Sequence, residues 1–194
     1  MSEEIKAGLP VLAFAHAAAF EAWLARAPRT HAGLWLRLFK KDSGVASLSR
    51  AEAVDAALCH GWIDGQADKY DAESWLIRFT PRRPRGRWSE VNVRRVGELM
   101  EAGRMRPAGQ AEVDAAKADG RWAAAYPPQS QATVPEDLQA ALDAAPAAAA
   151  FFATLKGANR YAILHRIGAV KKPETRARKI VQFVEMLARG ETIH

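Results

Sequence analysis

The first forty residues alternate between short apolar runs and helical periodicity. Residues 9–14 form an apolar run that fits an edge strand. Residues 16–26 place alanine, phenylalanine, tryptophan and leucine at helical spacing, which predicts an amphipathic helix. Residues 33–40 (GLWLRLFK) are nearly all apolar or aromatic, a pattern typical of a buried strand.

A second helix and two further strands follow. Ser49 and Glu52 form a capping box, in which the serine oxygen accepts from the third helical amide and the glutamate reaches back. This motif predicts a helix that runs to His60. Residues 62–64 and 74–80 then read as strands on either side of a polar stretch.

From Ser89 onward the pattern is helical. Ser89 is placed to cap one helix, and Pro107 is placed to begin another. Residues 126–131 (YPPQSQ) are the best linker candidate, and Thr133 with Glu136 suggests a second capping box. No strand is predicted beyond Ser89.

These elements predict an α+β protein that is mostly helical, with a small antiparallel sheet in the N-terminal half. The sheet would contain GLWLRLF, WID and SWLIRFT. We expect residues 1–126 to form an α+β core with a basic loop, and residues 127–194 a helical region. The C-terminal helices either pack on the sheet or form a small second lobe.

Composition narrows the class of protein without naming a reaction. The chain has 194 residues, 49% hydrophobic and 26% charged, which are ordinary globular values. The only cysteine is Cys59, so neither an intrachain disulfide nor a cysteine-rich zinc site is possible. There is no apolar run long enough to span a membrane and no basic start of a signal peptide. We expect a cytoplasmic protein with no metal and no cofactor.

The net charge of +6 is unevenly distributed. Residues 78–106 carry nine arginines and three glutamates, and residues 156–194 carry nine basic and three acidic side chains. Residues 107–155 between them carry two basic and six acidic side chains. The two basic segments would attract anions if they converge in space, and otherwise they are solvated helix faces.

The densest basic segment is RFTPRRPRGRWSEVN, residues 78–92. Its prolines stiffen a loop, and arginine forks bind phosphate or carboxylate with two hydrogen bonds. The start of the Ser89 helix adds backbone N–H groups, and Trp88 is a candidate for stacking or capping. Alternatively, these arginines pair with acids of the preceding hairpin, namely Asp64, Asp68, Asp71 and Glu73.

The motif CHGWIDG, residues 59–65, contains a thiol, a base and a carboxylate, which are the parts of a nucleophilic site. Cys59 and His60 are adjacent on one helix, however, so their side chains diverge by about 100°. Cys59 is better explained as a small core residue, and no catalytic residue is assigned. Asp64 either fixes a turn, pairs with an arginine or contacts a ligand.

Taken in order, the motifs GLWLRLFKKDSG, LSRAEAVDAALCHGWIDG, RFTPRRPRGRWSEVN and MRPAGQAEVDAAKADGRW resemble the bacterial YdeI/OmpD-associated family, also described as bacteriocin-protection proteins. The tail KKPETRARKIVQFVEMLARGE resembles the same family's last helix. The resemblance covers residues 10–191 and is weakest over 123–158. It implies that signature positions fall at Trp62, Asp64, Pro81, Arg82, Trp88, Ser89 and Asn92.

Three functions remain open. The preferred one is a cytoplasmic binding or stress-protection protein that holds an anionic small molecule or protein partner in an arginine-lined groove. The second is weak, non-specific nucleic-acid binding, and the third is an enzyme acting on a phosphorylated or carboxylated small molecule. The candidate ligand-binding residues are Asp64, Arg78, Arg82, Arg83, Arg85, Arg87, Trp88, Ser89 and Asn92.

Overall fold

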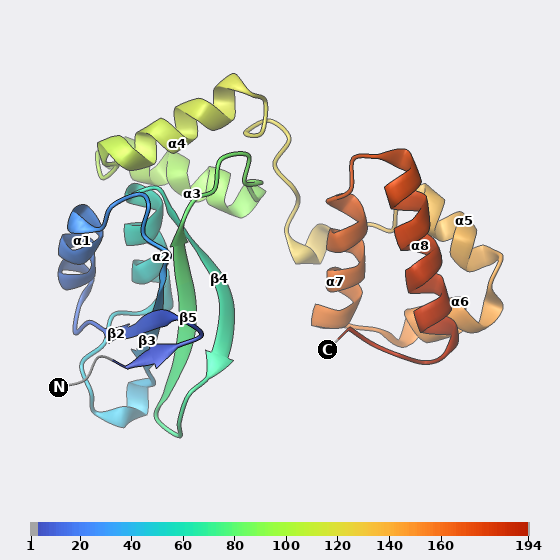
Figure 1. Ribbon diagram of the computed structural model, residues 1–194, viewed down its shortest axis with the longest axis horizontal. Helices are drawn as coiled ribbons and strands as arrows, with labels where there is room; N and C mark the ends of the chain where they lie inside the picture. The colour runs from blue at the N-terminus through green and yellow to red at the C-terminus, as the bar shows by residue number, and fades with distance from the viewer. Residues whose placement is uncertain (1–3, 194) are drawn as a thin grey trace. The chain divides into compact units, whose positions relative to one another are not determined.

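The chain folds as two units whose boundary lies between Tyr126 and Pro127. The computed structural model describes residues 4–193. The first unit combines a sheet with helices, and the second contains helices α5 to α8 (Figure 1). The predicted α+β class is confirmed. No helix in the described part of the chain is both long and apolar enough to cross a membrane.

The sheet of the first unit has five strands in the order β1-β2-β3-β5-β4. The strands are β1 (Ile5–Lys6), β2 (Leu9–Ala13), β3 (Leu34–Phe39), β4 (Trp62–Lys69) and β5 (Ser74–Pro81). The three strands predicted for the sheet correspond to β3, β5 and β4, which lie side by side in that order and pair antiparallel. The sheet is mixed rather than antiparallel, because β2 runs parallel to β3 after a helical crossover.

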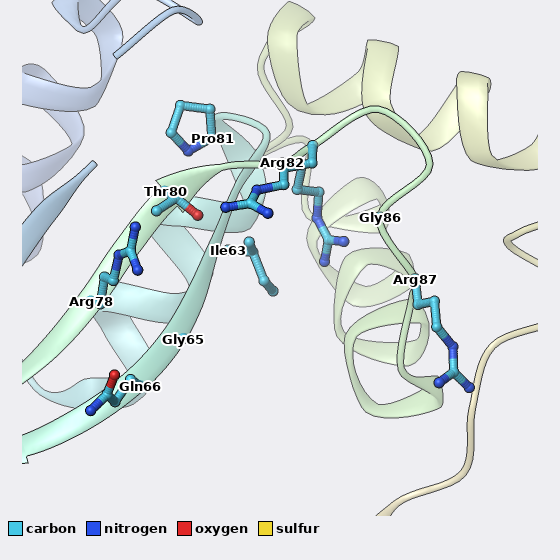
Figure 2. A pocket seen from close by; sticks show the side chains of 10 residues that line it. Ile63, Gly65, Gln66, Arg78, Thr80, Pro81, Arg82, Gly86 and Arg87 are labelled. Carbon is cyan, nitrogen blue, oxygen red and sulfur yellow. The ribbon is translucent and has the colours of Figure 1, made fainter. Parts of the chain in front are cut away.

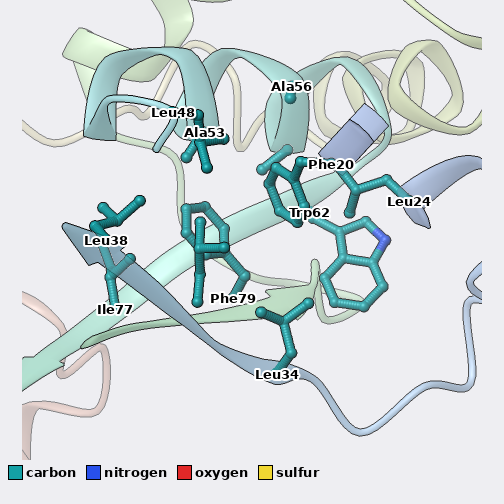
Figure 3. Close-up of a cluster of buried hydrophobic side chains, with 12 residues drawn as sticks. Phe20, Leu24, Leu34, Leu38, Leu48, Ala53, Ala56, Trp62, Ile77 and Phe79 are labelled. Carbon is teal, nitrogen blue, oxygen red and sulfur yellow. The ribbon is translucent and has the colours of Figure 1, made fainter. Parts of the chain in front are cut away.

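Helices α1 (Ala17–Arg26) and α2 (Arg50–Cys59) pack on one face of this sheet. Figure 3 shows their contact with the strands, where Phe20 of α1 and Ala53 of α2 meet Phe79 of β5 in one buried cluster. The predicted capping box begins α2: Ser49 accepts from the Glu52 N–H, and the Glu52 side chain accepts from the Ser49 N–H. Because Ser49 and Glu52 are only three residues apart, the start of α2 could be predicted from the sequence.

Helices α3 (Glu90–Glu101) and α4 (Pro107–Ala118) complete the first unit. The start of α4 lies directly against the end of α2, since the Arg106 N–H donates to the Cys59 carbonyl oxygen at 3.0 Å. Gly109 is required at this contact, because a Cβ there would lie 2.1 Å from the same oxygen. Between residues 89 and 191 no strand forms, as predicted, and Ser89 and Tyr126 make one isolated bridge.

The second unit has its own apolar core. Its helices are α5 (Glu136–Asp143), α6 (Pro146–Thr154), α7 (Gly157–Gly168) and α8 (Pro173–Ala188). Each of them contributes to one buried cluster, which includes Leu138, Phe152, Ile163 and Phe183. The capping box predicted at Thr133 is wrong: α5 begins at Glu136 itself, after Pro135, and no side chain caps it.

Gly109→Ala is expected to destabilise the first unit, because α4 must move away from the Cys59 carbonyl oxygen to admit the new Cβ. Overpacking of this kind costs about 1–3 kcal/mol. The loss should appear as a lower free energy of unfolding in urea. Gly97→Ala in α3 is the control: nothing lies within 4 Å of its Cβ position, so helix propensity should stabilise the protein by up to about 1 kcal/mol. Similar effects at both glycines would contradict the packing argument.

The acid stability of the helical unit should depend on Asp137. The Arg176 guanidinium donates to both Asp137 carboxylate oxygens, at 2.5 and 2.8 Å, and to the Ile167 carbonyl oxygen at 2.9 Å, so it ties α8 to α5 and α7. The hydrogen bonds from Arg176 lower the pKa of Asp137 in the folded state. The stabilisation is therefore complete above the unfolded pKa of about 3.9 and is lost as pH falls through the lower folded pKa.

Asp137→Asn should consequently lower the stability of the helical unit at neutral pH and reduce its further loss on acidification. Thermal unfolding measured at neutral and acid pH tests this. Asp143 accepts a hydrogen bond from the neutral Gln139 side chain at 2.8 Å. Asp143→Asn is therefore the control, and it should leave the acid response unchanged. An Asp137→Asn protein that loses as much stability in acid as the unsubstituted one would refute the coupling.

Candidate anion-binding site

The basic loop, residues 82–88, connects β5 to α3 and is held at two points. At its start, the Arg82 N–H donates to the Gly61 carbonyl oxygen at 2.9 Å. Near its end, Nη1 of Arg121 donates to the Gly86 carbonyl oxygen at 2.9 Å. These bonds fix the loop beside the ends of β4 and β5.

A cavity of about 250 Å³ lies between the loop and the two strands. Figure 2 shows Arg78 and Arg82 beside the strands, whereas Arg87 extends away from them. The ten lining residues include four arginines and no acidic side chain, so the cavity has a positive potential. They are Ile63, Gly65, Gln66, Arg78, Thr80, Pro81, Arg82, Arg83, Gly86 and Arg87.

Arg82 is the most unusual of these residues, because its guanidinium group is buried and incompletely paired. The residue is only 5% exposed. Its guanidinium carbon lies 3.5 Å from the ring centroid of Trp88, a cation–π contact that holds the guanidinium plane. Nε and Nη2 are both buried without a hydrogen-bond partner in the described structure. Buried charged donors are normally paired, so this pair of N–H groups requires an explanation.

Burial changes the electrostatics of Arg82 but does not neutralise it. Loss of solvent lowers the pKa of Arg82 to about 10, and the nearby carboxylates of Glu112 and Asp64 oppose this effect. Glu112 is itself engaged by the Arg29 guanidinium. Arg82 therefore remains a cation at neutral pH, in surroundings that compensate its charge only in part.

Three more arginines complete the positive lining. Arg78 is half-buried on β5, and its Nε is also a buried donor without a partner in the described structure. Arg83 and Arg87 are exposed, and the Arg87 guanidinium carbon lies 4.8 Å from the ring centroid of Tyr126. Within residues 4–193, no carboxylate forms an ion pair with any of these three arginines or with Arg82.

Three of the four hairpin acids pair with basic residues outside the basic loop, contrary to the alternative in which they neutralise the loop arginines. Asp64 pairs with Arg50 at 3.0 Å. Asp68 pairs with Lys6 at 2.5 Å, and Asp71 pairs with Arg37 at 2.7 Å. Glu73 forms no ion pair within the described residues. The loop arginines are thus not neutralised by the preceding hairpin.

Asp64 and Asn92, two of the proposed site residues, line a different cavity. Asp64 is paired across the sheet with the core residue Phe79, whereas its neighbour Ile63 is paired with Thr80 in the arginine cavity. Alternate strand residues point to opposite faces, so Asp64 lies on the side of α2 and α3. There it shares a cavity of about 570 Å³ with Asn92 and Arg50.

The remaining proposed residues have structural positions around the cavity. Trp88 is 2% exposed and lies beneath Arg82, so it supports the guanidinium instead of presenting a free ring. Ser89 caps α3 by accepting from the Asn92 N–H, at 3.2 Å, and does not line the cavity. Arg85 is exposed on the loop and is likewise outside the lining.

Several lining residues were not proposed from the sequence. Ile63, Gly65 and Gln66 of β4 and Thr80 of β5 form the strand side of the cavity, and Pro81 lies where the loop begins. The alternation of Arg78 and Thr80 with core positions was the signal that could have identified this face. This alternation shows that β4 and β5 line the same side of the cavity only once the pairing of the two strands is known.

Cys59 and His60 do not form a nucleophilic pair. Cys59 is buried, and burial raises the pKa of its thiol, as in an unreactive core cysteine. His60 lines another cavity, between α1 and α4. Within residues 4–193, no group of three or more histidine, cysteine, aspartate or glutamate side chains is arranged to hold a metal ion.

Comparison with known protein families assigns the two units to different models. Residues 12–112 match the family described as Domain of unknown function (DUF8412). Residues 131–190 match the family described as Bacteriocin-protection, YdeI or OmpD-Associated. The predicted resemblance to this second family is confirmed, but its match lies in the helical unit and includes residues 131–158, which had been expected to resemble it least.

No curated protein and no solved structure shows a significant match to the chain. The first family model covers more than half of the sequence. The chain therefore belongs to the family described as Domain of unknown function (DUF8412), and its helical unit carries a domain of the bacteriocin-protection, YdeI or OmpD-associated family.

Proposed function

We propose that the first unit binds a small organic anion in the Arg82 cavity, through a carboxylate or phosphate group. The observation that carries this proposal is the buried Arg82 guanidinium with Nε and Nη2 unpaired. These two nitrogens share one edge of the guanidinium plane, so their N–H groups form the fork that binds two oxygen atoms. An anion on this edge would satisfy both donors.

The surroundings of Arg82 support a small ligand. Trp88 holds the guanidinium plane, so little side-chain entropy is lost on binding. Ile63 and Pro81 give the cavity an apolar wall, and its volume of about 250 Å³ suits a compact organic acid or phosphate ester. Arg83 and Arg87 lie exposed on the same loop and would raise the local concentration of anions.

Nucleic-acid binding has weaker support. Trp88 was the candidate for stacking on a base, and its ring is buried beneath Arg82. The exposed arginines of the loop remain available for phosphate contacts that carry no sequence information. Such contacts would give non-specific binding with a Kd of roughly 10⁻⁴–10⁻⁶ M at physiological salt.

The enzymatic alternative required Asp64 to act as acid or base beside the arginines. Asp64 lines a separate cavity and pairs with Arg50. None of the ten residues that line the Arg82 cavity is an aspartate, glutamate, histidine or cysteine. The geometry thus favours binding over proton transfer at this site.

We place this binding activity in the cytoplasm and associate it with a protective role. A single buried cysteine accords with a reducing compartment. The match of residues 131–190 to the bacteriocin-protection family supports the protective association.

Arg82→Gln should weaken anion binding by removing the fork. Charge-assisted hydrogen bonds contribute about 1.5–3 kcal/mol each, so affinity should fall roughly tenfold or more. Calorimetric titration with acetate, benzoate, inorganic phosphate and phenyl phosphate measures this. Arg85→Gln is the matched control, since it removes the same charge from the same loop outside the cavity. If both variants lose the same affinity, the effect is general charge attraction and not binding by the fork. If the unsubstituted protein binds none of these anions, the proposal is refuted.

Arg82→Met separates a ligand-binding arginine from a structural one. Methionine keeps an apolar contact with Trp88 and removes a buried charge whose N–H groups lack partners. We expect the free energy of unfolding of the ligand-free protein to be unchanged or higher, while anion binding is lost. Denaturant titration with and without ligand gives both quantities. A large loss of stability in the ligand-free protein would mean that Arg82 mainly serves the fold.

A further inference from the structure

A second cavity of the first unit lies between α1 and the contact of α2 with α4. Its volume is about 610 Å³, and it shares no lining residue with the Arg82 cavity. The α1 side is formed in part by Ala18, Ala22 and Ala25, which fall on one helical face. The opposite side contains His60 and the first residues of α4.

His60 gives this cavity a buried polar group without a partner. It ends α2, is 9% exposed, and its backbone N–H donates to the Ala56 carbonyl oxygen at 3.2 Å. Its Nε2 is buried and has no hydrogen-bond partner in the described structure. Burial lowers the pKa of His60, so the imidazole is neutral in the empty cavity, where it can donate one hydrogen bond.

The N-terminus of α4 opens on the same cavity. Arg106 precedes the helix without a side-chain capping hydrogen bond, and Pro107 occupies the first turn. The first amides of a helix have no intrahelical acceptor and carry the positive end of the helix dipole. Arg106 is exposed and forms no ion pair within residues 4–193. Its charge and the helix terminus therefore act together.

One carboxylate also lines the cavity, and its charge is already compensated. Glu21 of α1 accepts a hydrogen bond from Nη2 of Arg104 at 3.0 Å. Arg104 is also 3.5 Å from the Asp55 carboxylate, which Arg95 engages as well. Arg106 is the one arginine among the residues that line this cavity, and no carboxylate pairs with it within the described residues.

We infer that this cavity is a second anion site, which binds the phosphate group of a small phosphorylated molecule. In the proposed complex the phosphate would accept from the Ala108 N–H, the Arg106 guanidinium and His60 Nε2, since Pro107 has no N–H and the Arg106 N–H is bonded to Cys59. The alanine face of α1 leaves room for the apolar part of the ligand. This site is independent of the Arg82 cavity, and each can exist without the other.

Titration with inorganic phosphate, followed by NMR, tests the inference. The backbone amide of Ala108 and the ring of His60 report this cavity, and the Trp88 indole reports the Arg82 cavity. We expect saturable shifts of the first set on addition of phosphate, and tighter binding of phenyl phosphate than of inorganic phosphate. In Arg106→Gln the affinity at these resonances should fall at least fivefold.

Arg26→Gln is the control, because it removes an exposed arginine of α1 that does not line the cavity and should leave the affinity unchanged. His60→Gln, which retains a donor, should weaken phosphate binding less than His60→Leu. Unchanged affinity in Arg106→Gln, equal losses in Arg106→Gln and Arg26→Gln, or no saturable shift at Ala108 would each overturn the site. Shifts confined to the Trp88 indole would also overturn it while leaving the Arg82 proposal intact.

Discussion

The rest of the first unit depends on the tight backbone turn between α2 and β4, residues 59–61. Within three residues, the Cys59 carbonyl oxygen accepts from the Arg106 N–H and the Gly61 carbonyl oxygen accepts from the Arg82 N–H. The first bond places α4, and the second places the basic loop. Gly61 has φ +76°, and a Cβ there would lie 2.9 Å from the Ala108 carbonyl oxygen. Both cavities are therefore built outward from one tight backbone junction, with His60 at its centre.

Arg82 and His60 share a property that distinguishes them from most buried polar residues. Arg82 has two side-chain nitrogens and His60 has one without a partner in the described structure, and each residue lines a cavity. Buried polar groups are normally hydrogen-bonded, because an unpaired buried donor lowers the stability of the fold by about 1–3 kcal/mol. The loss of stability is larger when the donor is charged. Rigid neighbours fix both unpaired groups: Trp88 contacts the Arg82 guanidinium, and His60 is held at the end of α2. Such pre-organisation is what a binding site requires.

The elements that depend on local signals were predictable. The Ser49–Glu52 capping box and the apolar run of β3 are determined by residues close together in the sequence, and both appear as expected. The parallel pairing of β2 was not predictable in the same way, since it depends on where the α1 crossover returns the chain. The place of Asp64 could not be predicted for a related reason. Asp64 follows Ile63 by one residue, and that single step moves it to the other face of the sheet. Only strand pairing decides which neighbours share a cavity.

Because the chain folds as two units, the match to the bacteriocin-protection family applies to the helical unit. The bacteriocin-protection match covers residues 131–190, which have their own core of helices α5 to α8. Both candidate anion sites lie in the first unit, in the segment matched by a family without a described function. The family match of the helical unit therefore does not explain why Arg82 is buried with two unpaired nitrogens. The proposed ligand chemistry therefore rests on the first unit, where the unpaired edge of Arg82, the unpaired Nε2 of His60 and the N-terminus of α4 lie beside the two cavities.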